Sequence, residues 1–186
     1  MKPKYLFMLL GHPGSGKTYF SEQLAADIGA VRVNADAMRV AALGTIEKAR
    51  EFNDKTGLLN SIVFGALDYV TVQVLKSGNS VISDYQHNEK RIRDKSVELA
   101  KANEATAIIV WVKAPRDIAI QRGSQRDERL DQRQHSLEKM EALVDKYIDL
   151  IEAPGNDEKV IVIDGTLAYE DQYRSFDQQL INLNRI

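Results

Sequence analysis

The sequence has 186 residues and a formal net charge of −2, with 44% hydrophobic and 28% charged residues. This size and composition are typical of one globular domain, and the near-neutral charge argues against a long nucleic-acid-binding surface. Because the chain contains no cysteine, disulfides, thiolate catalysis and cysteine-bound zinc are excluded.

Five short apolar runs predict strands. They are Tyr5–Leu10, Val31–Asn34, Ser80–Ser83, Ala107–Val112 and Val160–Ile163. Most are continuous rather than alternating, which indicates strands buried on both faces of a parallel sheet. The first run is six residues long and has no small-residue cleavage site, so it predicts a strand and not a signal peptide. With no apolar run near membrane-span length, we expect a cytoplasmic protein without membrane contact or an obligate protein partner.

Residues at helical spacing fill the intervals between these runs. The apolar stripes are Phe20–Ile28, Ile62–Val74, Leu137–Ile151 and Tyr173–Leu183. Glycines at 29 and 78 follow the first two stripes as helix ends. Alternating strands and helices predict a doubly wound α/β fold with a five-stranded parallel sheet flanked by helices, in a single domain spanning residues 1–186. The polar stretch Ala153–Lys159 is expected to be a surface turn.

The strongest motif follows the first predicted strand. It reads Gly11, His12, Pro13, Gly14, Ser15, Gly16, Lys17, Thr18 and fits the phosphate-binding pattern G-x-x-x-x-G-K-[ST]. Glycines let the backbone N–H groups approach phosphate oxygens, and the following helix adds its positive end. The motif predicts that Lys17 binds the β/γ-phosphates of ATP and that the Thr18 hydroxyl ligates Mg²⁺. His12 and Pro13 are expected to shape the loop.

Asp84 follows the apolar run that begins at Ser80. Open α/β sheets bind ligands at the carboxyl edge of their strands, so Asp84 is predicted to complete the Mg²⁺ site. The alternative is that Asp84 caps the next turn.

Asp36 and Arg39 lie one helical turn apart after the second predicted strand. As a functional pair, Asp36 would take the proton from an attacking hydroxyl and Arg39 would hold an anionic part of the acceptor. In the alternative interpretation Asp36 is the N-cap of the helix.

Four arginines follow the fourth predicted strand at spacings of 4, 3 and 4: Arg122, Arg126, Arg129 and Arg133. In a helix they would lie along one face. They predict either a solvated helix with internal ion pairs or an arginine-rich lid over about residues 122–135 that closes on ATP. Arg122 and Arg126 are the better candidates for contact with the nucleotide, because they lie nearest to the strand.

Taken together, GHPGSGKT, N-A-D-A-M-R, VISD and R-G-S-Q-R resemble the polynucleotide-kinase-like P-loop kinases of the AAA_33 and zeta-toxin-like group, over Lys4 to Lys146. The resemblance implies that Asp36 is the general base and Arg39 the acceptor-phosphate ligand. It also implies that Arg126 is the lid arginine on the ATP phosphates and that Arg122 lies near the nucleotide base. This chain has Asp84, Tyr85, Gln86 where the family often has Asp-Thr-Asn. The segment Val162–Thr166 imitates a phosphatase motif, but Val162 replaces its nucleophile and no phosphatase is expected.

The motifs therefore predict an ATP- and Mg²⁺-dependent phosphotransferase with an alcohol acceptor, resembling polynucleotide 5′-hydroxyl kinases. The acceptor is expected to bear a hydroxyl group, and a nucleotide or nucleic-acid end is one candidate that the sequence does not distinguish from a small molecule. The alternatives are a small-metabolite, sugar or antibiotic kinase, a toxin-type kinase acting on nucleotide sugars, and a nucleotide-binding switch or ATPase. A switch needs no hydroxyl-activating base, so the pairing of Asp36 with Arg39 argues against the last of these.

Overall fold

The computed structural model describes residues 3–85, 87–126 and 135–185. Within them the strands are β1 (Tyr5–Leu10), β2 (Val31–Asn34), β3 (Val81–Asp84), β4 (Thr106–Lys113) and β5 (Val160–Asp164). The helices are α1 (Lys17–Ile28), α2 (Ala35–Leu43), α3 (Ile46–Thr56), α4 (Leu59–Lys76), α5 (Lys90–Ala102), α6 (Arg116–Gln125), α7 (Leu137–Asp149) and α8 (Tyr169–Leu183).

The strands form one parallel sheet in the order β2-β3-β1-β4-β5, which confirms the predicted doubly wound fold. Every residue of β1 is buried, as its continuous apolar run predicts for a central strand. The second and third strands pair so that Asn34 lies opposite Asp84. This pairing continues β3 to Asp84, one residue beyond the predicted end.

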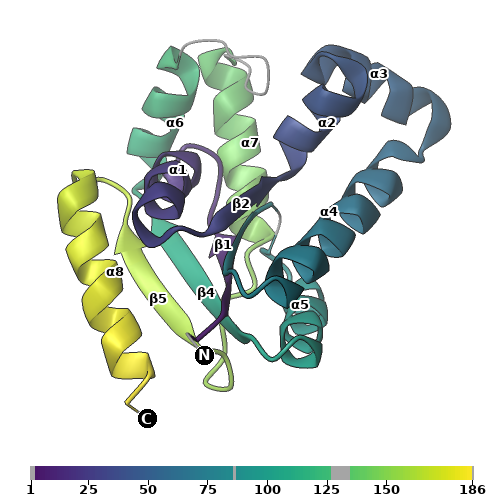
Figure 1. Cartoon of the computed structure of the whole chain (residues 1–186). Coiled ribbons are helices and arrows are strands. Elements are labelled where there is room, and N and C mark those ends of the chain that lie inside the picture. Colours follow the sequence, from purple (N-terminus) through teal and green to yellow (C-terminus); the bar gives the residue numbers. More distant parts are fainter. Residues whose placement is uncertain (1–2, 86, 127–134, 186) are drawn as a thin grey trace.

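Two hydrophobic clusters cover the two faces of the sheet. On one face, Phe7 packs with Phe20 of α1 and Phe176 of α8. On the other face, Leu6 and Met8 pack with residues of α4 and α5 such as Leu67 and Ala100. Figure 1 shows α8 beside β5 at one edge of the sheet, with α2, α3 and α4 forming an arch on the opposite side.

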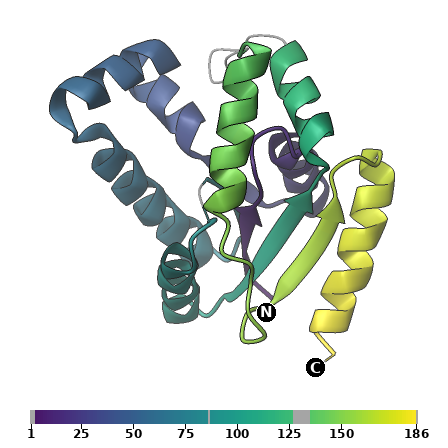
Figure 2. The ribbon, with the colours of Figure 1, turned by 180° about the vertical axis from the view of Figure 1, so that it is seen from behind.

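A smaller cluster joins α6 to α7. It consists of Ala119, Ile120, Met140 and Val144. Seen from behind, the two helices stand side by side above the sheet (Figure 2). The residues that connect them, 127–134, lie outside the described residues, as do Arg129, Arg133 and most of the predicted lid.

The predicted continuous arginine face is wrong at Arg126. Helix α6 ends at Gln125, and Arg126 has extended backbone dihedral angles, so Arg122 and Arg126 do not share a helix face. Gly123 and Ser124 come just before this end, and both have low helix propensity. The alternative interpretation of Asp36 as the N-cap is also wrong, because Asn34 caps α2 by accepting a hydrogen bond from the Ala37 N–H at 2.8 Å.

No single helix within the described ranges is long and apolar enough to cross a membrane. Helices α3 and α4 meet the length and composition criteria only as a pair bent by 116°.

Candidate active site

The phosphate loop joins β1 to α1 at the carboxyl edge of the sheet. Three of its glycines have positive φ angles: 143° at Gly11, 78° at Gly14 and 100° at Gly16. A Cβ atom on Gly14 would lie 2.2 Å from the carbonyl oxygen of Ala119. The loop therefore requires glycine for its backbone conformation and also for its close packing against α6.

Lys17 begins α1 and turns back over the loop. Its Nζ donates hydrogen bonds to the carbonyl oxygens of Gly11, at 2.7 Å, and His12, at 2.8 Å. Burial lowers the pKa of Lys17 to about 8, and the Asp84 charge partly offsets this shift. The ammonium is thus held at the centre of the loop, where the phosphate groups of a nucleotide would lie.

The other loop side chains have distinct environments. The ring nitrogens of His12 lie 3.0 Å from the carbonyl oxygen of Pro13 and 3.1 Å from that of Ala114, so His12 braces the loop. The hydroxyl of Ser15 is buried and finds no hydrogen-bond partner among the described residues. Thr18 is half-buried in the first turn of α1.

A buried polar cluster surrounds the carboxylate of Asp84. Its Oδ2 accepts hydrogen bonds from the Arg32 guanidinium, from Ser21 Oγ at 3.2 Å and from Asn34 Nδ2 at 2.9 Å. The hydrogen bond from Arg32 Nε to Asp84 Oδ2 is 3.0 Å long. The described donors to the Asp84 side chain lie on α1 and β2 and not in the segment that follows β3, so they do not support the alternative that Asp84 caps the next turn. We did not predict from the sequence that Arg32, Ser21 and Asn34 bind Asp84. The signal that could have indicated such a partner was an arginine inside a short strand that pairs with β3.

On the acceptor side, Asp36 and Arg39 bind each other. Arg39 Nη1 donates to Asp36 Oδ1 at 2.7 Å, Nη2 donates to Asn60 Oδ1 at 2.8 Å, and the guanidinium lies over the Phe64 ring at 5.7 Å. The Arg39 side chain is 17% exposed, whereas that of Asp36 is 51% exposed. The two predicted residues therefore lie together, and α4 supplies partners for Arg39 that the sequence did not indicate.

These residues line a cavity of about 410 Å³ between the phosphate loop and the arch of α2, α3 and α4. Its walls are polar and apolar in nearly equal measure, and Phe64, Tyr85 and Tyr147 are its aromatic residues. The lining residues are Gly11, Pro13, Lys17, Thr18, Asn34, Ala35, Asp36, Arg39, Ile46, Ala49, Arg50, Asn53, Asp54, Leu59, Asn60, Phe64, Asp84, Tyr85, Asn88 and Tyr147. We call this space the acceptor cavity, after the predicted roles of Asp36 and Arg39.

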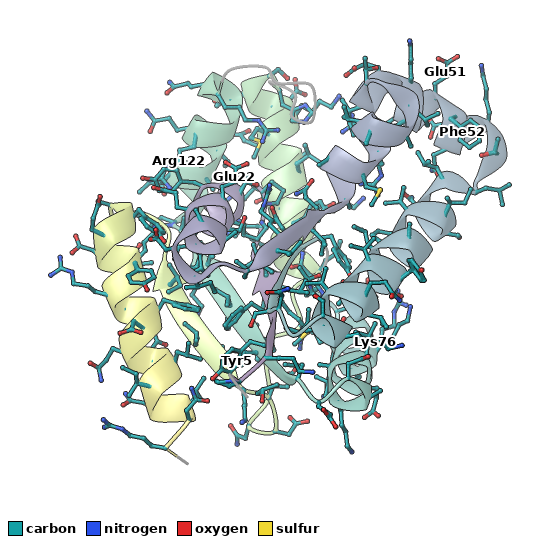
Figure 3. All side chains as sticks on the ribbon, viewed as in Figure 1. Tyr5, Glu22, Glu51, Phe52, Lys76 and Arg122 are labelled. Carbon is teal, nitrogen blue, oxygen red and sulfur yellow. The ribbon has the colours of Figure 1, made fainter. Side chains whose placement is uncertain are left out.

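A second cavity of about 550 Å³ lies on the other side of the loop, against α6 and the turn after β5. Its lining residues are Pro13, Gly14, Gly16, Lys17, Thr18, Tyr19, Arg122, Gly123, Arg126, Gly165, Thr166, Leu167 and Ala168. Arg122 donates to the Gly165 carbonyl oxygen at 2.7 Å. We call this space the nucleotide cavity. Figure 3 shows the labelled Arg122 on this side, well separated from Glu51 and Phe52 of α3.

The structure thus brings most of the predicted site residues around the phosphate loop. Thr18, Asp36, Arg39 and Asp84 line the acceptor cavity, Arg122 and Arg126 line the nucleotide cavity, and Lys17 and Thr18 line both. Gln86 lies outside the described residues. The sequence did not indicate Arg50, the asparagines at 53, 60 and 88, or the aromatic wall of Phe64 and Tyr85, because they come from two separate helices, α3 and α4, and from the loop after β3.

Comparison with known proteins places this arrangement in context. A sequence model described as an AAA domain, AAA_33, matches residues 6–154. No curated protein matches the sequence. A gluconokinase from Sinorhizobium meliloti 1021 is similar in structure, with a TM-score of 0.65 and 18% identity over 97% of this chain and 93% of that one.

Two further solved structures share the fold. A candidate kinase from Chloroflexus aurantiacus j-10-fl has a TM-score of 0.70 and 18% identity over 96% of this chain and 99% of its own. A sugar kinase from Janibacter sp. HTCC2649 has a TM-score of 0.66 and 19% identity over 98% and 95% of the two chains. The chain therefore has the fold of P-loop kinases.

Proposed function

The chain belongs to the AAA_33 family of AAA domains, and from this premise we propose that it is an ATP-dependent kinase that phosphorylates a hydroxyl group of a small polar acceptor. The observation that carries the proposal is the pair of cavities that share Pro13, Lys17 and Thr18. A nucleotide bound along the loop would have its base and sugar in one cavity and would present its γ-phosphate to the other. A nucleotide switch would need only the cavity that holds the base and sugar.

The side chains present fit a magnesium ion. Mg²⁺ prefers oxygen ligands and retains several waters. Thr18 supplies a hydroxyl and Asp84 a carboxylate, and both line the acceptor cavity. The described donors to Asp84 all bond Oδ2, so its Oδ1 is the oxygen available to the ion or to its bound water. When bound, the ion would neutralise charge on the transferring phosphate.

Asp36 is the proposed proton acceptor for the attacking hydroxyl. Its carboxylate is half exposed in the acceptor cavity, and it is held by Arg39 at 2.7 Å. Arg39 is held in turn by Asn60 and Phe64, which fix its position. We propose that Arg39 orients Asp36 and contacts the acceptor from the same place. Lys17 and Arg126 would stabilise the phosphate charge, while Arg122 would lie near the base.

The acceptor cavity favours a small polyhydroxylated compound over a nucleic-acid end. Its volume of about 410 Å³ is that of a small-molecule site. Amide side chains donate and accept hydrogen bonds and carboxylates accept them, as neighbouring hydroxyl groups require. Asn53, Asn60, Asp36 and Asp54 supply such groups, and Phe64 supplies an apolar face. The gluconokinase and the sugar kinase of the same fold support this class.

A screen of acceptors with labelled ATP tests the proposal. It should compare sugars, sugar acids and polyols with nucleosides, 3′-phosphorylated nucleosides and oligonucleotide 5′ ends. We expect Mg²⁺-dependent transfer to at least one small polyol and none with the Lys17→Met variant. Transfer to oligonucleotide ends alone would contradict the acceptor class. If the protein hydrolyses ATP and no acceptor changes the rate of hydrolysis or takes up phosphate, this outcome would contradict kinase activity itself.

A further inference from the structure

Asn88 touches both the phosphate loop and the acceptor cavity. It follows β3, is 7% exposed, and its Oδ1 accepts a hydrogen bond from the Gly11 N–H at 3.4 Å. A backbone N–H only donates, so the facing side-chain atom is the amide oxygen, and the NH₂ group is directed elsewhere. This NH₂ group has no hydrogen-bond partner among the described residues, while Asn88 lines the acceptor cavity.

A fully buried arginine fixes the backbone on which Asn88 sits. Arg93 of α5 is 0% exposed, and its Nη1 donates to the carbonyl oxygens of His87, at 3.1 Å, and Asn88, at 3.0 Å. Both carbonyls belong to the loop between β3 and α5. Two bonds from one rigid guanidinium leave this loop little freedom to rotate.

The opposite edge of the Arg93 guanidinium binds a carboxylate. Its Nε and Nη2 donate to the two oxygens of Glu158, at 2.7 and 3.1 Å. The Glu158 side chain is 6% exposed. The hydrogen bond from Arg93 is the main cause that lowers the pKa of Glu158, which favours the charged form of this carboxylate. The predicted surface turn Ala153–Lys159 therefore carries a buried ion-pair partner.

Glu152, the residue just before this turn, also holds the loop between β3 and α5. The Glu152 N–H donates to the Asn88 carbonyl oxygen at 2.9 Å, and the Glu152 carboxylate accepts from the Lys90 N–H. Glu152 follows α7, the helix that carries Tyr147 into the acceptor cavity. Two segments far apart in the sequence thus fix Asn88 from two sides.

We propose that Asn88 orients the reactive hydroxyl of the acceptor through its amide NH₂ group, and that Arg93 and Glu158 are positioning residues acting through Asn88. The inference rests on the proposed kinase function. One amide would bind the loop through its oxygen and the acceptor through its nitrogen. It would therefore set the distance from the hydroxyl to the phosphate, a quantity on which transfer rates depend strongly.

The test measures how the enzyme partitions ATP between the acceptor and water. The ratio of transfer to hydrolysis does not depend on the fraction of folded enzyme, so a purely structural defect leaves it unchanged. Asn88→Ala should lower this ratio about 10- to 100-fold, the size of one lost hydrogen bond in the transition state, with the KM for ATP within about threefold. Glu158→Gln should lower the ratio in the same direction by a smaller factor.

A double variant and two controls separate the roles. If Glu158 acts through Asn88, the Asn88→Ala/Glu158→Gln variant should have the same ratio as Asn88→Ala alone. Arg93→Lys keeps the positive charge but loses the planar guanidinium that binds Glu158 and the loop at once. It should lower the ratio about as much as Glu158→Gln does. Leu75→Ala removes a fully buried side chain near the end of α4, so it should create a cavity and lower stability without changing the ratio.

The outcomes distinguish the two proposals. A wild-type protein that transfers phosphate to no acceptor would overturn both the kinase function and this inference. Efficient wild-type transfer with an unchanged ratio in Asn88→Ala would overturn only the role of Asn88. Additive losses in the double variant would show that Glu158 does not act through Asn88.

Discussion

Arg32 binds Asp84 across two neighbouring strands, and both of its donors, Nε and Nη2, reach the same carboxylate oxygen. The pair is largely buried, with Arg32 17% and Asp84 5% exposed in their side chains. Because β2 and β3 are parallel and in register here, the arginine from one strand reaches the aspartate at the end of the other. The proposed metal ligand is thus charge-compensated and fixed by the sheet itself.

Removing Arg32 alone should therefore destabilise the protein. Arg32→Ala leaves a buried carboxylate without its counter-charge, at a cost of about 3–5 kcal/mol in the free energy of unfolding. The double variant Arg32→Ala/Asp84→Asn should recover part of this loss, because the uncompensated charge is gone. Urea unfolding of wild type, single and double variants measures both values. Equal free energies of unfolding for Arg32→Ala and for the double variant would refute the explanation that an uncompensated buried charge causes the loss.

Asp84→Asn should affect the metal more than the nucleotide. Replacing the carboxylate by an amide should raise the Mg²⁺ concentration for half-maximal activity about 10- to 100-fold. Titration of activity with Mg²⁺ at saturating ATP measures the change. Glu22→Gln is a suitable control, since Glu22 is an exposed partner of Arg32 outside both cavities, and it should leave the Mg²⁺ titration unchanged.

Nucleotide affinity should fall at alkaline pH. Burial lowers the pKa of Lys17 to about 8, so above this pH the free protein loses the ammonium that phosphate binding requires. The dissociation constant for ADP should be flat below pH 7 and should rise by up to about tenfold per pH unit above pH 8. Calorimetric titrations from pH 6.5 to 9.5 measure it. Lys17→Met should bind more weakly, without this rise.

Asp36→Asn should separate binding from transfer. The amide still accepts a hydrogen bond from Arg39 but is a far weaker proton acceptor, so transfer should fall about 100-fold or more. ADP binding should stay within about threefold of wild type, because Asp36 does not line the nucleotide cavity. Transfer kinetics and ADP titrations on the same preparation test both statements. A large loss of ADP affinity would place Asp36 in the nucleotide site.

Gly14→Ala should abolish nucleotide binding while Gly29→Ala should not. Both glycines have positive φ, so both changes carry a backbone cost of about 1–2 kcal/mol. Only at Gly14 would the new Cβ meet another atom, the Ala119 carbonyl oxygen at 2.2 Å; nothing lies within 4 Å at Gly29. ADP titration of the two variants separates loop displacement from simple strain.

The sequence was sufficient for the sheet and for the phosphate loop. Continuous apolar runs identify buried strands, and the loop motif has fixed spacing, so neither depends on distant parts of the chain. Helix α3 was not predicted, because it buries only Ile46 and Ala49 and shows no apolar stripe. Helix α5 was missed for a related reason: the largest side chain on its buried face is Arg93.

The sequence could place candidate site residues together where they belong to one local motif. It could not do so where tertiary contacts join residues from distant parts of the chain. Asp36 and Arg39 are one helical turn apart, and the structure keeps them together. Arg32 and Asp84 are 52 positions apart, and only the strand register joins them. The spacing of the arginines after β4 suggested one helix face, but the end of α6 at Gln125 prevents this.

Most of the acceptor cavity is built from one continuous stretch, residues 34–64, between β2 and the middle of α4. Apart from Pro13, Lys17 and Thr18, the nucleotide cavity uses other parts of the chain. Under the proposed function, the choice of acceptor would therefore lie in residues 34–64, apart from most of the residues that would bind ATP. We expect that exchanging this segment between proteins of the same fold would change which alcohol is phosphorylated and leave the phosphate donor the same.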